Sequence, residues 1–119
     1  TIDTPGPGTE GERPEFIVLG EEGLYVLDKR ARLIHLIDPA TNEVILTKPS
    51  GGFTIVPAVG EEGLWTVDCD TGTLLLLDPR TLERIGELAG LQDGCGVATG
   101  EGSVWVTTYN TIVRVAPQR

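Results

Sequence analysis

The chain of 119 residues carries 18 acidic and 9 basic side chains, which gives a formal net charge of −9 at neutral pH. Such an acidic surface repels nucleic-acid phosphates and anionic membranes, so we expect neither as a partner. Hydrophobic residues make up 39% and charged residues 23% of the chain, a composition that suits a single globular domain and excludes a disordered or collagen-like protein.

Turn residues interrupt the apolar runs at short intervals along the whole chain, which excludes long helices and favours many short strands. In chain order, strands are expected at 15–19, 24–27, 33–37 and 43–47, then at 53–59, 64–67, 73–77 and 83–88, and finally at 96–99, 104–107 and 111–115.

Three copies of one segment begin forty residues apart: GEEGLYVLD at 20, GEEGLWTVD at 60 and GEGSVWVTT at 100. A fixed period of this length is typical of a repeat fold. An aromatic residue holds the same offset in each copy, as Tyr25, Trp65 and Trp105. Because their place in the repeat is fixed, core packing explains them better than a carbohydrate-stacking platform does.

The third strand of each unit predicts sheets that are covered on both faces. In the middle unit it reads Leu74-Leu75-Leu76-Leu77, with no alternation of buried and wet positions. Repeated four-stranded antiparallel sheets covered on both sides are the blades of a β-propeller. We therefore expect an all-β fold of three blades, half of a six-bladed propeller, at about 14–50, 51–90 and 91–119, preceded by a tail at 1–13.

Three blades cannot close a ring, so each end of the arc would expose an apolar face and favour association. We expect oligomerisation to complete the ring, as a homodimer of six blades, with the remainder of a longer propeller as the alternative partner. The third unit ends before its outer strand. Residues 1–4 of the tail could supply that strand beside 111–115 of a partner, or the tail could be disordered.

Residues 100–117, GEGSVWVTTYNTIVRVAP, resemble the YVTN-type β-propeller repeat, whose second strand reads aromatic-Val and whose third reads Asn-Thr-Val. The Asp-Pro-x-Thr turn of that family matches residues 38–41 and 78–81. Related families are the NHL repeats and the virginiamycin B lyase-like propellers. The resemblance covers about 14–117, and it departs at Ala116, where Asp is expected, and in having only three repeats. It implies a propeller fold and points to a secreted or periplasmic location without fixing it.

In propellers, the loops between second and third strands and the loops that enter each inner strand emerge on one face, where ligands usually bind. We expect a binding surface there, although aspartates in such loops can also simply shape the turns. The candidate residues are Asp28, Lys29, Arg30, Asp68, Asp70, Asp93, Tyr109 and Asn110. No metal site and no cofactor is expected.

Cys69 and Cys95 fall in loops of adjacent blades, where they could form a disulfide or remain two free thiols. A metal-binding or nucleophilic role has less support, because no histidine lies near them in the sequence. His35, the single histidine, takes a third-strand position that Leu75 and Val113 hold in the other units. A packed histidine is therefore favoured over a catalytic one.

These features favour a non-enzymatic propeller scaffold that assembles into a closed ring and binds a small molecule or protein on its loop face. One alternative is an enzyme of the lyase or hydrolase type with its site at the channel mouth. The other is an engineered or excised propeller fragment whose only activity is assembly.

Overall fold

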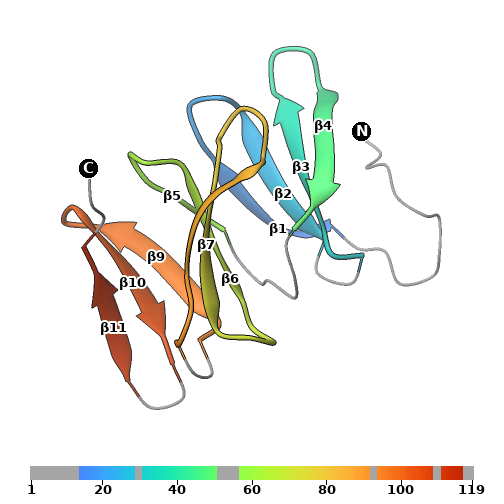
Figure 1. Cartoon of the computed structure of the whole chain (residues 1–119). Coiled ribbons are helices and arrows are strands. Elements are labelled where there is room, and N and C mark those ends of the chain that lie inside the picture. The colour runs from blue at the N-terminus through green and yellow to red at the C-terminus, as the bar shows by residue number, and fades with distance from the viewer. Residues whose placement is uncertain (1–13, 29–30, 51–56, 92–93, 109–110, 117–119) are drawn as a thin grey trace.

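The structure, a computed structural model, describes residues 14–28, 31–50, 57–91, 94–108 and 111–116. These residues form eleven β-strands and no helix, so the described part of the chain has no helix able to span a membrane. The strands make three antiparallel sheets that follow one another along the chain (Figure 1). The prediction of an all-β fold of antiparallel sheets is confirmed.

Each sheet is a simple meander in which neighbours in sequence are neighbours in space. Sheet A contains β1 (Pro14–Leu19), β2 (Leu24–Asp28), β3 (Leu33–Asp38) and β4 (Glu43–Pro49). Sheet B contains β5 (Ala58–Val59), β6 (Leu64–Asp68), β7 (Thr73–Leu77) and β8 (Arg84–Leu88). Sheet C contains β9 (Gly96–Gly100), β10 (Ser103–Thr107) and β11 (Ile112–Val115).

The strand ends lie within one or two residues of the expected ones, except at β5, where residues 51–56 are outside the described part. The third sheet has three strands in the described residues, whereas the other two sheets have four each. The tail at 1–13 also lies outside the described residues, so its expected role as a strand stays a prediction.

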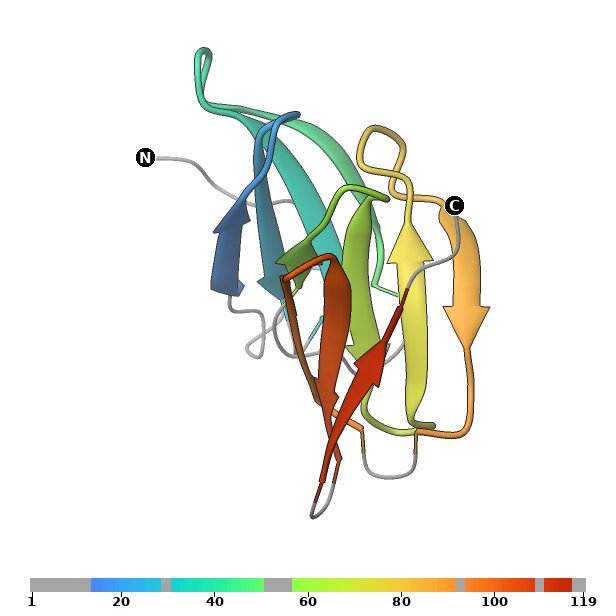
Figure 2. The ribbon, with the colours of Figure 1, turned by 90° about the vertical axis from the view of Figure 1, so that its left-hand side faces the viewer.

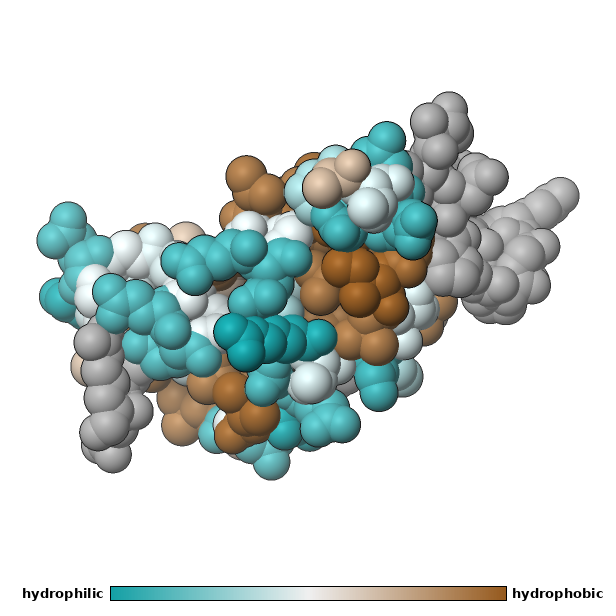
Figure 3. Space-filling view, turned by 90° about the horizontal axis from the view of Figure 1, so that it is seen from above, coloured by the Kyte–Doolittle hydropathy of each residue, from teal (hydrophilic) through white to brown (hydrophobic). Residues whose placement is uncertain are grey.

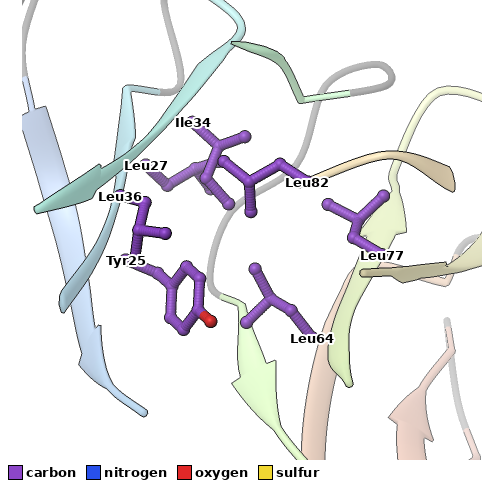
Figure 4. Packing of buried hydrophobic residues seen from close by; sticks show 7 residues of the cluster. All are labelled: Tyr25, Leu27, Ile34, Leu36, Leu64, Leu77 and Leu82. Carbon is purple, nitrogen blue, oxygen red and sulfur yellow. The ribbon is translucent and has the colours of Figure 1, made fainter. Parts of the chain in front are cut away.

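The three sheets stack face to face, with sheet B in the middle (Figures 1 and 2). The first strands of successive sheets run near one another, since β1 contacts β5 and β5 contacts β9. Two apolar cores fill the spaces between the sheets. The A–B core contains Tyr25, Leu27, Ile34, Leu36, Leu64, Leu77 and Leu82 (Figure 4). The B–C core contains Ala58, Trp65, Val67, Leu74, Leu91, Val104 and Val106.

Strand alternation assigns each repeat position to one face of its sheet. Tyr25 of sheet A faces sheet B, and Trp65, forty residues later, faces sheet C. The residue just before the aromatic one faces the preceding sheet: Leu64 contributes to the A–B core and Val104 to the B–C core. In each sheet, we call the face that carries the aromatic residue the forward face and the opposite face the backward face.

Glycine is required where β1 turns into β2 and where β5 turns into β6. Gly23 and Gly63 have φ of 146° and 149°, a region that side chains rarely adopt. A Cβ on Gly63 would stand 2.6 Å from the carbonyl oxygen of Leu77. The third unit has Ser103 at this position, and it turns instead through positive φ at Glu101 and Gly102.

Leu82 is a bulky residue held at a φ of 60°, where its counterpart in the first unit is Asn42 at 59°. The left-handed conformation costs an ordinary side chain roughly 1–2 kcal/mol. Burial of the leucine side chain, which is only 3% exposed in the A–B core, contributes about 1.5–3 kcal/mol in return. Burial therefore offsets the strain of a leucine at this position (Figure 4), whereas the exposed Asn42 adopts the same φ without such packing.

Candidate functional site

The structure describes only part of the predicted loop surface. Asp28 is buried, and its Oδ1 accepts a hydrogen bond from the backbone N–H of Ala31 at 2.9 Å. Asp68 accepts hydrogen bonds from the Asp70 backbone N–H at 3.0 Å and from the Thr71 hydroxyl at 3.1 Å. These contacts favour the turn-forming role of both aspartates. The other predicted residues, Lys29, Arg30, Asp93, Tyr109 and Asn110, lie outside the described part.

The same loops join the sheets to one another. Arg32 of sheet A forms an ion pair with Asp70 of sheet B at 3.4 Å, with both side chains about half exposed. Cys69, which follows β6, forms a disulfide with Cys95, which precedes β9. Of the two states that the sequence left open for the cysteines, the structure contains the disulfide. At this end of the stack, the ion pair therefore links sheets A and B, and the disulfide links sheets B and C.

His35 lies away from these loops. The side chain is fully buried on the backward face of sheet A, and Nδ1 is 2.8 Å from the Thr47 hydroxyl on β4. A histidine enclosed in this way has no open route to a substrate, so its environment is that of a packed residue.

A groove of about 610 Å³ opens at the opposite end of the stack, where the β1–β2, β5–β6 and β9–β10 turns meet. Its lining includes five glutamates, Glu21, Glu22, Glu61, Glu62 and Glu101, together with apolar residues. Figure 3 looks onto this end, where hydrophilic residues cover much of the middle of the stack and hydrophobic residues lie beside them. The groove is lined by residues from all three sheets, and sheet B also contributes Pro79 from its β7–β8 turn.

Two hydrogen bonds between sheets hold the floor of the groove. The Tyr25 hydroxyl donates to the Pro79 carbonyl at 2.6 Å, and the Thr99 hydroxyl donates to the Val59 carbonyl at 2.6 Å. Burial, reinforced by the negative charges of Glu22 and Asp78, raises the pKa of Tyr25 to about 12. The phenol therefore stays neutral and serves as a donor to Pro79, not as a base.

Arg80 lies at the rim, where its Nε is 3.0 Å from Glu22 Oε1. The hydrogen bond and the charge of Glu22 raise the pKa of Arg80 further above its ordinary value. This pair joins the β7–β8 turn of sheet B to the β1–β2 turn of sheet A, next to the bond between Tyr25 and Pro79. Two polar contacts therefore link sheets A and B at this end of the stack.

The charged side chains of the lining are all glutamates, and the lining includes neither histidine nor cysteine. Such a surface favours cationic or donor-rich ligands and repels anions. The described residues hold no group of three His, Cys, Asp or Glu that could bind a metal ion. Glu21, Glu61 and Glu101 hold the same offset in the three copies of the repeat, and this sequence signal could have indicated the acidic end.

No protein-family model matches the sequence, and neither does any curated protein. Among solved structures, Kuenenia stuttgartiensis hydrazine synthase is similar in fold, with a TM-score of 0.66 and 14% sequence identity. The similarity covers 95% of this chain but only 36% of that chain. At this identity the likeness concerns the fold alone.

Proposed function

We propose that the chain is a non-enzymatic scaffold of the YVTN propeller type, whose three sheets are blades that assemble with further blades into a closed ring. The observation that carries this proposal is the repeated stacking. Tyr25 and Trp65 sit at the same offset in successive sheets and pack forward against the next sheet in the same way. A unit that stacks by one rule on both sides extends until its end faces are covered.

The exposure of apolar side chains supports the need for further blades. On the backward face of sheet A, Ile17 and Leu19 are 61% and 67% exposed, and on the forward face of sheet C, Ile112 is 69% exposed. Val59, the sheet B counterpart of Leu19, packs against the A–B core. Exposed apolar surface of this kind favours association.

The free edge of sheet C is a second point of assembly. β4 and β8 pair with β3 and β7, whereas the described residues place no strand beside β11. An unpaired edge strand is a template for an added strand. The expected donor is the segment at residues 1–4 of a partner, which lies outside the described residues and is part of the proposal.

Two features bear on where the scaffold acts and on what it binds. The Cys69–Cys95 disulfide supports an oxidising compartment, in line with a secreted or periplasmic location. The acidic groove and the turn surface at the other end of the stack are the candidate places for a ligand or a protein, and the net charge of −9 disfavours anionic ones.

Size-exclusion chromatography with light scattering tests the assembly. We expect a stable species of twice the 12.7 kDa of one chain, or a larger closed assembly. A chain that remains monomeric over the full concentration range, with its strand content intact by circular dichroism, would contradict the proposal.

A further inference from the structure

The two outer faces of the stack carry exposed residues that correspond, by repeat position, to the two sides of an internal interface. In both interfaces, the forward face presents its aromatic residue to the backward face of the next sheet. At the ends, the forward face of sheet C carries Trp105, which is only partly buried, and the backward face of sheet A carries the exposed Ile17 and Leu19. The exposed parts of the two end faces therefore correspond to opposite sides of one interface, whereas Val26, His35 and Ile37 on the backward face of sheet A are already buried.

The contact between inner strands shows how closely these halves match. A Cβ on Gly20 would stand 3.4 Å from Val59 of the next sheet, and one on Gly60 would stand 3.3 Å from Thr99. Gly100 is the third residue of this series, and a Cβ there would meet nothing within 4 Å. The counterpart of Val59 and Thr99 is Leu19, which is 67% exposed. By repeat position, the space beside Gly100 is the one that Leu19 would fill, and Leu19 is itself exposed.

An ion pair of the A–B interface has no counterpart on the two end faces. The ion pair between Glu22 and Arg80 crosses the A–B interface at 3.0 Å. At the end faces the corresponding residues are Gly102 and Ala40, so both members of the pair are missing. Joining the two end faces would leave no unpaired charge at this place, which would otherwise be costly.

Arg114 places a positive charge on the forward face of sheet C. Its counterparts Leu36 and Leu76 are apolar. The guanidinium lies 4.9 Å from the centroid of the Trp105 ring, and Nε donates to the Ser103 hydroxyl at 2.7 Å. An arginine stacked on an indole is held in place for a carboxylate that approaches the same ring.

Repeat equivalence identifies that carboxylate. In the A–B interface the Tyr25 hydroxyl donates to the carbonyl of Pro79, the residue after Asp78, so this turn lies beside the hydroxyl end of the aromatic side chain. The corresponding turn on sheet A contains Asp38 and Pro39. If sheet A is placed after sheet C, Asp38 comes to Trp105 and hence to Arg114.

We propose that the forward face of sheet C packs on the backward face of sheet A of a second copy, with Leu19 of one copy beside Gly100 and Trp105 of the other, and Asp38 paired with Arg114. The inference rests on the proposed function. The contact uses the β1 side and rim of sheet A, because Val26 and His35 on the same face are already buried. Made twice between two copies, it closes a ring of six sheets.

Charge exchange in the full-length chain tests the pairing, with the dimer dissociation constant measured by analytical ultracentrifugation. We expect Arg114→Glu and Asp38→Lys each to raise that constant at least about tenfold, and the combined variant to recover most of the loss. Arg84→Glu makes the same charge change on the exposed strand β8 and should leave the dimer unaffected. Leu19→Arg is a second test, which changes an exposed side chain and leaves the Asp38 turn intact.

The outcomes separate this inference from the proposed function. A wild-type chain that is monomeric would refute both. If Arg114→Glu and Leu19→Arg both still dimerise, the chain assembles but not through this contact. The same conclusion follows if the double charge exchange does not restore the dimer. Species that keep growing with concentration would overturn the closed ring.

Discussion

The A–B and B–C interfaces both have an apolar core, but different polar and covalent contacts link the sheets in each. Between A and B, polar contacts lie at both ends, with Tyr25–Pro79 and Glu22–Arg80 beside the groove and Arg32–Asp70 at the other end. Between B and C, the Thr99–Val59 hydrogen bond lies beside the groove and the Cys69–Cys95 disulfide at the other end. The repeat therefore fixes which faces meet, and each interface adds its own links.

The aromatic residues show the difference most directly. The Tyr25 hydroxyl crosses to sheet B and donates to the Pro79 carbonyl. Trp65 is 7% exposed, and its Nε1 has no hydrogen-bond partner in the described residues. A buried donor left unpaired costs about 1–3 kcal/mol. The B–C interface therefore bears a cost that the A–B interface, where the Tyr25 hydroxyl is bonded, does not.

The largest effects are expected from leucines that fill the two cores. Leu77→Ala opens the A–B core and Leu74→Ala the B–C core, both from the same strand of sheet B, and both side chains are at most 3% exposed. We expect each change to lower the free energy of unfolding by about 2–5 kcal/mol, as lost contacts and a cavity combine. Urea denaturation followed by circular dichroism measures both.

Leu88→Ala is the matched control on β8, where the side chain is 45% exposed, and it should cost far less. Equal losses at Leu74 and Leu77 would mean that the two interfaces depend equally on apolar packing. A small loss at either leucine would show that its interface does not hold the fold together.

Removal of the disulfide should weaken the B–C interface selectively. In the loop-entropy relation, closing a separation of 26 residues stabilises the folded chain by about 3 kcal/mol. We expect the double variant Cys69→Ser, Cys95→Ser to lose about that much. Hydrogen exchange should show faster opening of sheet C than of sheet A. Uniform acceleration across all three sheets would argue that the stack unfolds as one unit.

The hydroxyl of Tyr25 should make stability depend on alkaline pH. Its folded pKa of about 12 lies above the ordinary value of 10, so its contribution is complete below pH 10 and is lost as the pH rises towards 12. The loss is on the order of 2 kcal/mol. Denaturation across this range should show the decline, and Tyr25→Phe should flatten it. An unchanged decline in that variant would assign the effect to other groups.

The smallest effect is expected at Arg80, the exposed member of its ion pair with Glu22. Surface ion pairs contribute little to stability and are screened by salt. Arg80→Ala should therefore shift the thermal midpoint less than any change above, and the shift should vanish in high salt. A loss as large as that of Leu77→Ala would show that this rim contact is essential to the A–B interface.

Local sequence patterns were sufficient to place the strands. Gly23 and Gly63 end the first turns because only glycine tolerates their φ, and the Asp-Pro turns at 38 and 78 separate the third strands from the fourth. These are interactions between near neighbours along the chain. A single sequence therefore predicts them, together with the repeat and the all-β fold.

The stacking of the sheets decided the rest. Tyr25, Trp65 and Trp105 hold one offset in the repeat, yet only the first two are buried, because within the described residues only their sheets are followed by another sheet. Likewise, the sequence left the state of Cys69 and Cys95 open, and it did not bring the glutamates of three turns into one groove. Contacts between residues about forty positions apart depend on how whole sheets are placed, and that placement is set by the packing of entire faces rather than by any local pattern.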